Sequence, residues 1–141
     1  MAQFYMSVQG APAVIRNMGT VTRVMADRVA LGLRAAGLEL QRASQQMAPV
    51  EFGNLRASAY TTSRGTGFGT IVEVGYTASY ALFVHEKVGM VLRGQLRSPS
   101  PPHQGRYWDP QGRAQAKFLE TPARTMAPQL MTIIRRTAGI T

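Results

Sequence analysis

The chain has 141 residues, a length that fits one domain with a single modest core. Its 45% hydrophobic content is ordinary for a globular protein, and sixteen Lys and Arg against seven Asp and Glu give a formal net charge of +9. The absence of cysteine excludes disulfides, thiolate metal sites and a cysteine nucleophile. We expect no secretory signal, because the N-terminus lacks a charged head followed by an apolar core. We also expect no membrane span, because no apolar run approaches the roughly 20 residues that a span needs. We therefore expect one domain over 1–141 without a membrane contact, beginning with an irregular arm over 1–12.

A long amphipathic helix is predicted after this arm. Over 14–47 the apolar residues recur at steps of three and four, which places them in one stripe on a helix. The stripe consists of Val14, Met18, Val21, Met25, Val29, Leu33, Ala36, Leu40, Ala43 and Met47. Glycine is unfavourable inside a helix, so we expect a bend or break near Gly32 to Gly37, or fraying before Gly19. Pro49 ends the helix, because the residue before a proline is disfavoured in the α region.

A β-hairpin is predicted next. Leu55 to Ser63 is interpreted as its first strand, and the glycine-dense segment Arg64–Gly69 as its turn. Thr70 to Gly75 alternates in the manner of a half-buried strand. Tyr80 to His85 is either a third strand or a short helix, because so short an apolar run does not distinguish the two.

The last third of the chain combines an extended loop with a second helix. The segment 87–116 is rich in proline, glycine and arginine. Val88 to Leu92 could form a strand that extends the hairpin, and we assign no fixed structure in the free protein to the Pro-rich part after it. From Phe118 to Ile134 the apolar residues return to helical spacing. Pro122 suits a first helical turn, whereas Pro128 makes the helix bend or begin there. The predicted fold is α+β: a small antiparallel sheet packed against a long N-terminal helix and a C-terminal helix, with a long Pro/Arg-rich loop.

Patterns that would indicate catalysis or metal binding are weak. His85-Glu86 lacks the second histidine of a zinc-protease motif, since the position four residues after His85 is Gly89. The glycines of Arg64–Gly69 lead into a strand without a following Lys-Ser/Thr pair, so a hairpin turn is favoured over a phosphate-binding loop. No serine occupies a Gly-x-Ser-x-Gly elbow. We therefore expect no enzymatic activity, no cofactor and no metal.

The extended loop interleaves arginine with aromatic residues. The residues concerned are Arg93, Arg97, Arg106, Tyr107, Trp108 and Arg113. This combination suits a protein interface, because Trp, Tyr and Arg dominate binding energies there. It also suits phosphate contacts with base stacking, so a basic nucleic-acid-binding protein that contacts DNA through this loop is the alternative. A solvated linker is a third interpretation, and we favour the protein interface.

Four short motifs follow one another along the chain. They comprise Ala48, Pro49, Val50, Gly53, Leu55, Arg56 and Ser58; then Val74 and Gly75; then Tyr80, Ala81, Val84 and Glu86; and finally Phe118, Leu119 and Ala123. In this order they resemble the neck or tail-completion (head–tail joining) minor structural proteins of long-tailed bacteriophages. The loop over 87–116 is longer than the resemblance implies, so loop contacts of that family do not transfer.

The resemblance implies a structural virion protein of the head–tail junction, present in the host cytoplasm during assembly. Its expected partners are further copies in a ring of six or twelve, head-side connector or stopper proteins and the tail terminator, with packaged DNA nearby. We expect a structural turn at Pro49, Gly53, Leu55 and Gly75. The expected partner contacts, besides the arginine and aromatic residues of the loop, are Tyr80, Phe83, His85 and Glu86.

Overall fold

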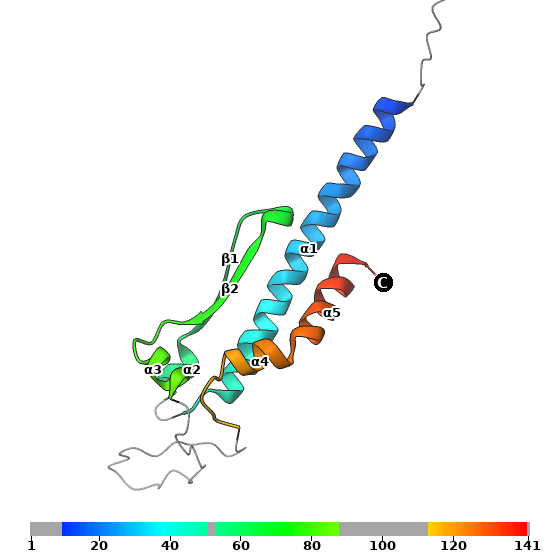
Figure 1. The fold of residues 1–141 in the computed structure, drawn as a ribbon. Helices are drawn as coiled ribbons and strands as arrows, with labels where there is room; N and C mark the ends of the chain where they lie inside the picture. Colours follow the sequence, from blue (N-terminus) through cyan, green and yellow to red (C-terminus); the bar gives the residue numbers. More distant parts are fainter. Residues whose placement is uncertain (1–9, 51–52, 88–112, 141) are drawn as a thin grey trace, which may run out of the picture.

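The computed structural model describes residues 10–50, 53–87 and 113–140 (Figure 1). The expected α+β arrangement is confirmed, since a two-stranded antiparallel sheet and the C-terminal helices pack against a long N-terminal helix. The elements in chain order are α1 (Ala11–Met47), α2 (Asn54–Ala57), β1 (Ala59–Arg64), the 3₁₀ helix η1 (Gly67–Gly69), β2 (Ile71–Tyr76), α3 (Ala81–Glu86), α4 (Glu120–Thr125) and α5 (Ala127–Ala138).

Helix α1 is continuous over 37 residues, so the expected break near Gly32 to Gly37 and the fraying before Gly19 are wrong. The reason is tertiary packing at the two buried glycines. A Cβ on Gly32 would lie 2.9 Å from the Cα of Ile134 in α5, and a Cβ on Gly37 would lie 2.5 Å from a methyl group of Val72 in β2. The absent side chains let α5 and the hairpin approach α1 closely, and this packing outweighs the helix propensity that glycine lacks.

The hairpin begins later than the sequence predicted. Asn54–Ala57 form the single turn α2, and β1 starts only at Ala59, so the expected strand from Leu55 is wrong over its first four residues. Gly53 adopts φ +82°, which reverses the chain after Pro49 and lets the Ala57 N–H donate to the Gly53 carbonyl at 3.0 Å. A helical turn therefore forms where a strand was expected.

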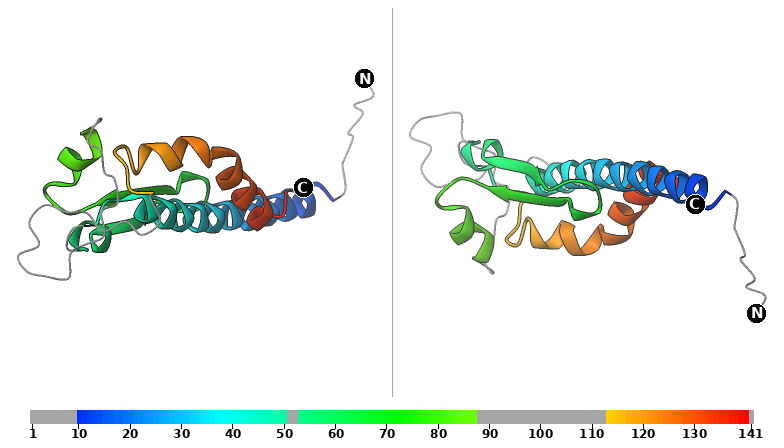
Figure 2. Two further views of the ribbon diagram at one scale, coloured as in Figure 1. Left: turned by 90° about the horizontal axis from the view of Figure 1, so that it is seen from below. Right: turned by 90° about the horizontal axis from the view of Figure 1, so that it is seen from above.

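The structure settles two alternatives that the sequence left open, at Tyr80–His85 and at Pro128. Tyr80–His85 is helical, since α3 spans Ala81–Glu86. The C-terminal segment is two helices, because α4 ends at Thr125 and α5 begins at Ala127, which places Pro128 in the first turn of α5. In both views of Figure 2, α4 and α5 lie along one side of α1. No helix among the described residues is long and apolar enough to cross a bilayer.

The buried core is small and rich in alanine. Ala26, Ala30 and Ala36 line the packed face of α1, and a second cluster at its C-terminal end contains Leu55 and Phe118. Alanine buries little apolar area, so each buried alanine contributes less to the stability of the fold than a buried leucine would. The N-terminal part of α1 extends beyond the other described elements (Figure 1), and its large apolar side chains are exposed.

Candidate interaction site

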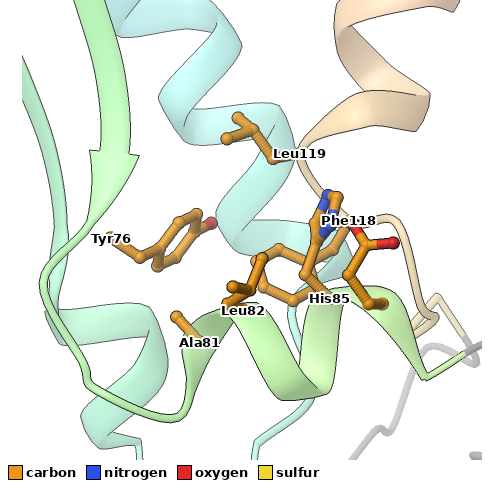
Figure 3. Close-up of a pocket in the computed structure, with 7 residues that line it drawn as sticks. Tyr76, Ala81, Leu82, His85, Phe118 and Leu119 are labelled. Carbon is orange, nitrogen blue, oxygen red and sulfur yellow. Dashed lines mark hydrogen bonds and ion pairs between the residues drawn. The ribbon is translucent and has the colours of Figure 1, made fainter.

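A pocket of about 300 Å³ opens between α3 and the segment that leads into α4 (Figure 3). Two stretches of the chain, 76–86 and 118–119, meet to form it. Its lining consists of Tyr76, Ala81, Leu82, His85, Glu86, Phe118 and Leu119. Most of these side chains are apolar, and the ionisable side chains of His85 and Glu86 lie in the last turn of α3.

Helix α3 is short, and backbone hydrogen bonds hold it in place. The Ala81 N–H donates to the Ala78 carbonyl at 2.9 Å, which starts the helix. At its other end the Lys117 N–H donates to the His85 carbonyl at 2.7 Å. Lys117 has φ +57°, a conformation uncommon for residues other than glycine, so it marks a tight turn just before α4. This turn joins α3 to the C-terminal helices.

An aromatic cluster forms the floor of the pocket. Phe118 is 1% exposed, and its ring meets Tyr76 edge-to-face at a centroid distance of 5.0 Å and His85 at 5.1 Å. The Tyr76 hydroxyl lies 2.7 Å from Oγ of the fully buried Ser44 in α1. Burial raises the pKa of Tyr76, so this hydroxyl keeps its proton and its hydrogen bond at neutral pH. The floor is thereby tied to α1.

A network of charged side chains borders the pocket. Lys117 pairs with Glu86 and, at 3.3 Å, with Glu120, whose other oxygen lies 2.8 Å from Arg124. His85 Nδ1 donates to Glu86 at 2.8 Å. Hydrogen bonds from Lys117 lower the pKa of both Glu86 and Glu120, and the bond from Glu86 raises the pKa of Lys117. Glu86, Glu120 and Lys117 stay charged near neutral pH, and their ion pairs link α3 to α4.

His85 has a structural position in this network. While its Nδ1 bonds to Glu86, its Nε2 accepts the backbone N–H of Glu120 at 3.4 Å. Neither ring nitrogen is therefore directed at an open site for a metal or a substrate proton. Across the described ranges 10–50, 53–87 and 113–140, no three His, Cys, Asp or Glu side chains are grouped in a way that could hold a metal ion.

The outer surface of α3 is apolar. Leu82 is 72% exposed and Phe83 65% exposed, and Tyr80 is also exposed at the start of the helix. Lys87 Nζ lies 4.9 Å from the centroid of the Phe83 ring, a cation–π contact on the surface. Three of the expected contact residues, Tyr80, Phe83 and Glu86, therefore lie at the surface, while His85 is half-buried. We call Leu82 and Phe83, together with the pocket beside them, the α3 surface.

The residues expected in the structural turn are in part buried. Pro49 and Leu55 are buried, and Gly75 lies opposite Tyr60, whose ring covers it closely. Arg113, expected at an interface, donates to Gln46 Oε1 at 3.2 Å. The other loop residues expected at an interface, Arg93, Arg97, Arg106, Tyr107 and Trp108, lie outside the described residues.

Sequence reasoning missed three residues that organise the site. Arg56 donates from Nε to the Ala48 carbonyl at 3.0 Å and thereby satisfies the end of α1. Ser44 anchors Tyr76, and Lys117 joins α3 to α4. The Arg56 position was visible as part of a motif, but the other two carried no signal, because their partners are far away in the sequence.

Comparisons with protein-family models, with curated proteins and with solved structures found no match. A mostly apolar pocket beside exposed Leu and Phe side chains is suited to receive an apolar side chain from another molecule.

Proposed function

We propose that this chain is a structural protein of the head–tail junction of a long-tailed bacteriophage. In this role it joins the head-side connector or stopper ring to the tail terminator during assembly, and it performs no chemistry. The observation that carries the proposal is the α3 surface, where Leu82 and Phe83 stand exposed beside an apolar pocket. Contiguous exposed apolar side chains of this kind mark sites of protein–protein contact.

The construction of the α3 surface supports a docking role. Its floor is fixed by Phe118 and by the Ser44–Tyr76 contact, and its border is fixed by the Glu86–Lys117–Glu120 network. A rigid pocket with an apolar interior and a charged border binds a partner without ordering many side chains first. The hydrogen-bonded His85 offers no free base for catalysis, which also favours binding over chemistry.

The small core gives a second line of support. Among the described residues the buried apolar side chains are mostly alanine, so burial within them contributes limited stability, and many of their large apolar side chains lie at the surface. Association with further copies or with other proteins covers such surfaces, as expected for a component of an assembly. The motif order Ala-Pro-Val, Gly-x-Leu-Arg-x-Ser, Val-Gly and Phe-Leu connects this behaviour to the phage neck.

The test is a complementation experiment with Leu82→Glu in a phage that lacks the wild-type gene. We expect free heads and free tails in electron micrographs, because a carboxylate at this position would have to be buried in the interface. Ile71→Glu is the matched control, since Ile71 is also exposed but lies on β2 at the hairpin tip, far from α3. Ile71→Glu particles should join normally.

Cryo-electron microscopy of purified particles gives the direct measurement. Density for this chain in a ring between connector and tail tube would support the proposal. Normal joining by Leu82→Glu phage would contradict it. Absence of the chain from particles, together with DNA binding that weakens steeply as salt is added, would also contradict the proposal. That result would favour the nucleic-acid alternative suggested by the net charge of +9.

A further inference from the structure

One side of α1 is not covered by another described element (Figure 2), and exposed apolar residues of α1 lie away from its packed face. Val24, Leu31 and Leu38 are 45%, 56% and 59% exposed. They are spaced seven residues apart, and two helical turns span about seven residues, so the three side chains form one row along α1. Ala35, between Leu31 and Leu38, widens the row. We call these four residues the outward ridge of α1.

The outward ridge is separate from the packed face of α1. The buried residues Ala30, Ala36 and Gly37 lie on the opposite side of the helix, where α5 and the hairpin contact it. The ridge is therefore not the margin of the core. Scattered exposed leucines are common, but a row at heptad spacing is the pattern of a helix that pairs with another helix.

Arginines flank the ridge on both sides. Arg23 and Arg34 lie on one side of the row, and Arg42 lies in line with it. Arg28 lies on the other side, where its Nη1 would be 3.4 Å from a Cβ on Gly139 at the end of α5, and all four arginines are exposed. None of the four forms an ion pair with another residue of the described ranges, although Arg34 Nε donates to Ser63 Oγ at 3.1 Å. The acids of this region are Asp27 and the half-buried Glu39, which leaves an excess of two positive charges.

The charge of this region decides which partner fits. A second copy would set arginines against arginines, and each copy carries +9. Nucleic acid would contact the arginines but leave Val24, Leu31 and Leu38 uncovered, because these aliphatic side chains offer no stacking platform. A bilayer needs a broader apolar face than a row one residue wide.

We propose that the outward ridge of α1 binds an acidic amphipathic helix of another protein. Apolar side chains at heptad spacing on that helix would cover Leu31 and its neighbours. Carboxylates that flank those apolar side chains would pair with the guanidinium groups of the arginines. The inference rests on α1 alone, so it does not depend on the proposed place of the chain in the phage neck.

The test uses the full chain and a fluorescent synthetic helix of about four heptads, with leucine at a and d and glutamate at e and g. A peptide with lysine in place of glutamate is the comparison ligand. Fluorescence anisotropy should show the glutamate peptide binding at least roughly tenfold more tightly than the lysine peptide. This preference should shrink as salt is added, because the pairs are exposed to solvent.

Three variants locate the binding surface. Leu31→Glu should weaken binding of the glutamate peptide by roughly tenfold or more, because it puts a carboxylate in the centre of the contact. Ile71→Glu is the matched control, since it puts the same carboxylate on an exposed apolar residue of β2 that belongs neither to the outward ridge nor to the α3 surface, and it should bind like the wild type. The double variant Arg28→Glu/Arg42→Glu should reverse the preference toward the lysine peptide. Circular dichroism melting confirms that each variant is folded.

Four results would overturn the proposal. They are equal binding of the two peptides, equal binding by Leu31→Glu and Ile71→Glu, a wild-type dimer in sedimentation that Leu31→Glu dissociates, and tight binding of duplex DNA or phosphatidylglycerol vesicles that Leu31→Glu abolishes. The last two would assign the ridge to a second copy, or to nucleic acid or a lipid surface.

Discussion

The N-terminal part of α1 extends beyond the other described elements, whereas its C-terminal part is packed between α5 and the hairpin (Figure 1). Both parts carry apolar residues at the same helical spacing. Val14, Met18 and Val21 are exposed, while Leu33 and Leu40 are partly buried. An amphipathic pattern therefore predicts that a helix face will be covered but does not specify what covers it.

The residue types of the two parts also differ. The packed part brings small residues, such as Ala30, Gly32, Ala36 and Gly37, to the contact with its neighbours. The extending part carries larger side chains that make no such contact within the described structure. Mutations should therefore have unequal effects in the packed and the extending regions, and the following predictions test this.

The largest expected effect is at Phe118. Phe118→Ala removes a buried ring that contacts Tyr76 and His85, and should lower the free energy of unfolding by about 3–5 kcal/mol. Met18→Ala, in the extending part of α1, should change it by less than about 0.5 kcal/mol. Urea denaturation measures both. Similar losses for the two variants would mean that the extending part is packed in solution.

Glycine substitutions within α1 should differ in sign. Gly32→Ala gains helix propensity, but its Cβ would meet the backbone of Ile134, so we expect a net loss of about 1–3 kcal/mol. Gly19→Ala meets nothing within 4 Å and should gain up to about 1 kcal/mol. Thermal melting of the pair is the measurement. Stabilisation by Gly32→Ala would contradict the close approach of α5.

The turn after α1 should depend on one backbone conformation. Gly53→Val forces a β-branched residue into φ +82° and should cost about 1–2 kcal/mol, all of it from the backbone, because a Cβ there meets nothing within 4 Å. Gly53→Asn is the matched control, since asparagine tolerates this conformation better. Unchanged melting of Gly53→Val would contradict the turn.

The smallest effect concerns pH at the border of the pocket. The pKa of Glu86 and of Glu120 is lowered in the folded state, chiefly by Lys117, so their contribution to stability is complete above their ordinary pKa of 4.5 and is lost as the pH falls below it. Lys117→Met should reduce this acid-dependent loss of stability. The measurement is melting between pH 7 and pH 3. Identical pH profiles for wild type and Lys117→Met would show that the network does not act in solution.

Much of the fold could be predicted from local pattern. The span of α1 follows from its apolar spacing and from Pro49, and the hairpin turn follows from the glycines between Arg64 and Gly69. The segment after Gly53 was mispredicted, because Leu55 to Ser58 has no periodicity long enough to separate a helical turn from a strand.

The candidate site was predictable only in part. The aromatic and apolar residues from Tyr80 to Glu86 could be recognised as a contact surface. The pocket beside them also requires Phe118 and Lys117. These two residues lie more than thirty positions away from His85 and Glu86 in the sequence. Ser44 was indistinguishable from other polar residues of α1 until Tyr76 was found against it. Partners brought together by folding leave no trace in local spacing.

Local sterics and composition set three features that can be read along the chain: the helical periodicity of α1, its end at Pro49 with the turn at Gly53, and the basic charge of the molecule. Contacts between distant segments set the rest: Gly32 and Gly37 are contact points within a continuous helix, and Leu31 and Leu38 are left exposed. The reason is that close packing, and not residue type, sets which surfaces a helix buries.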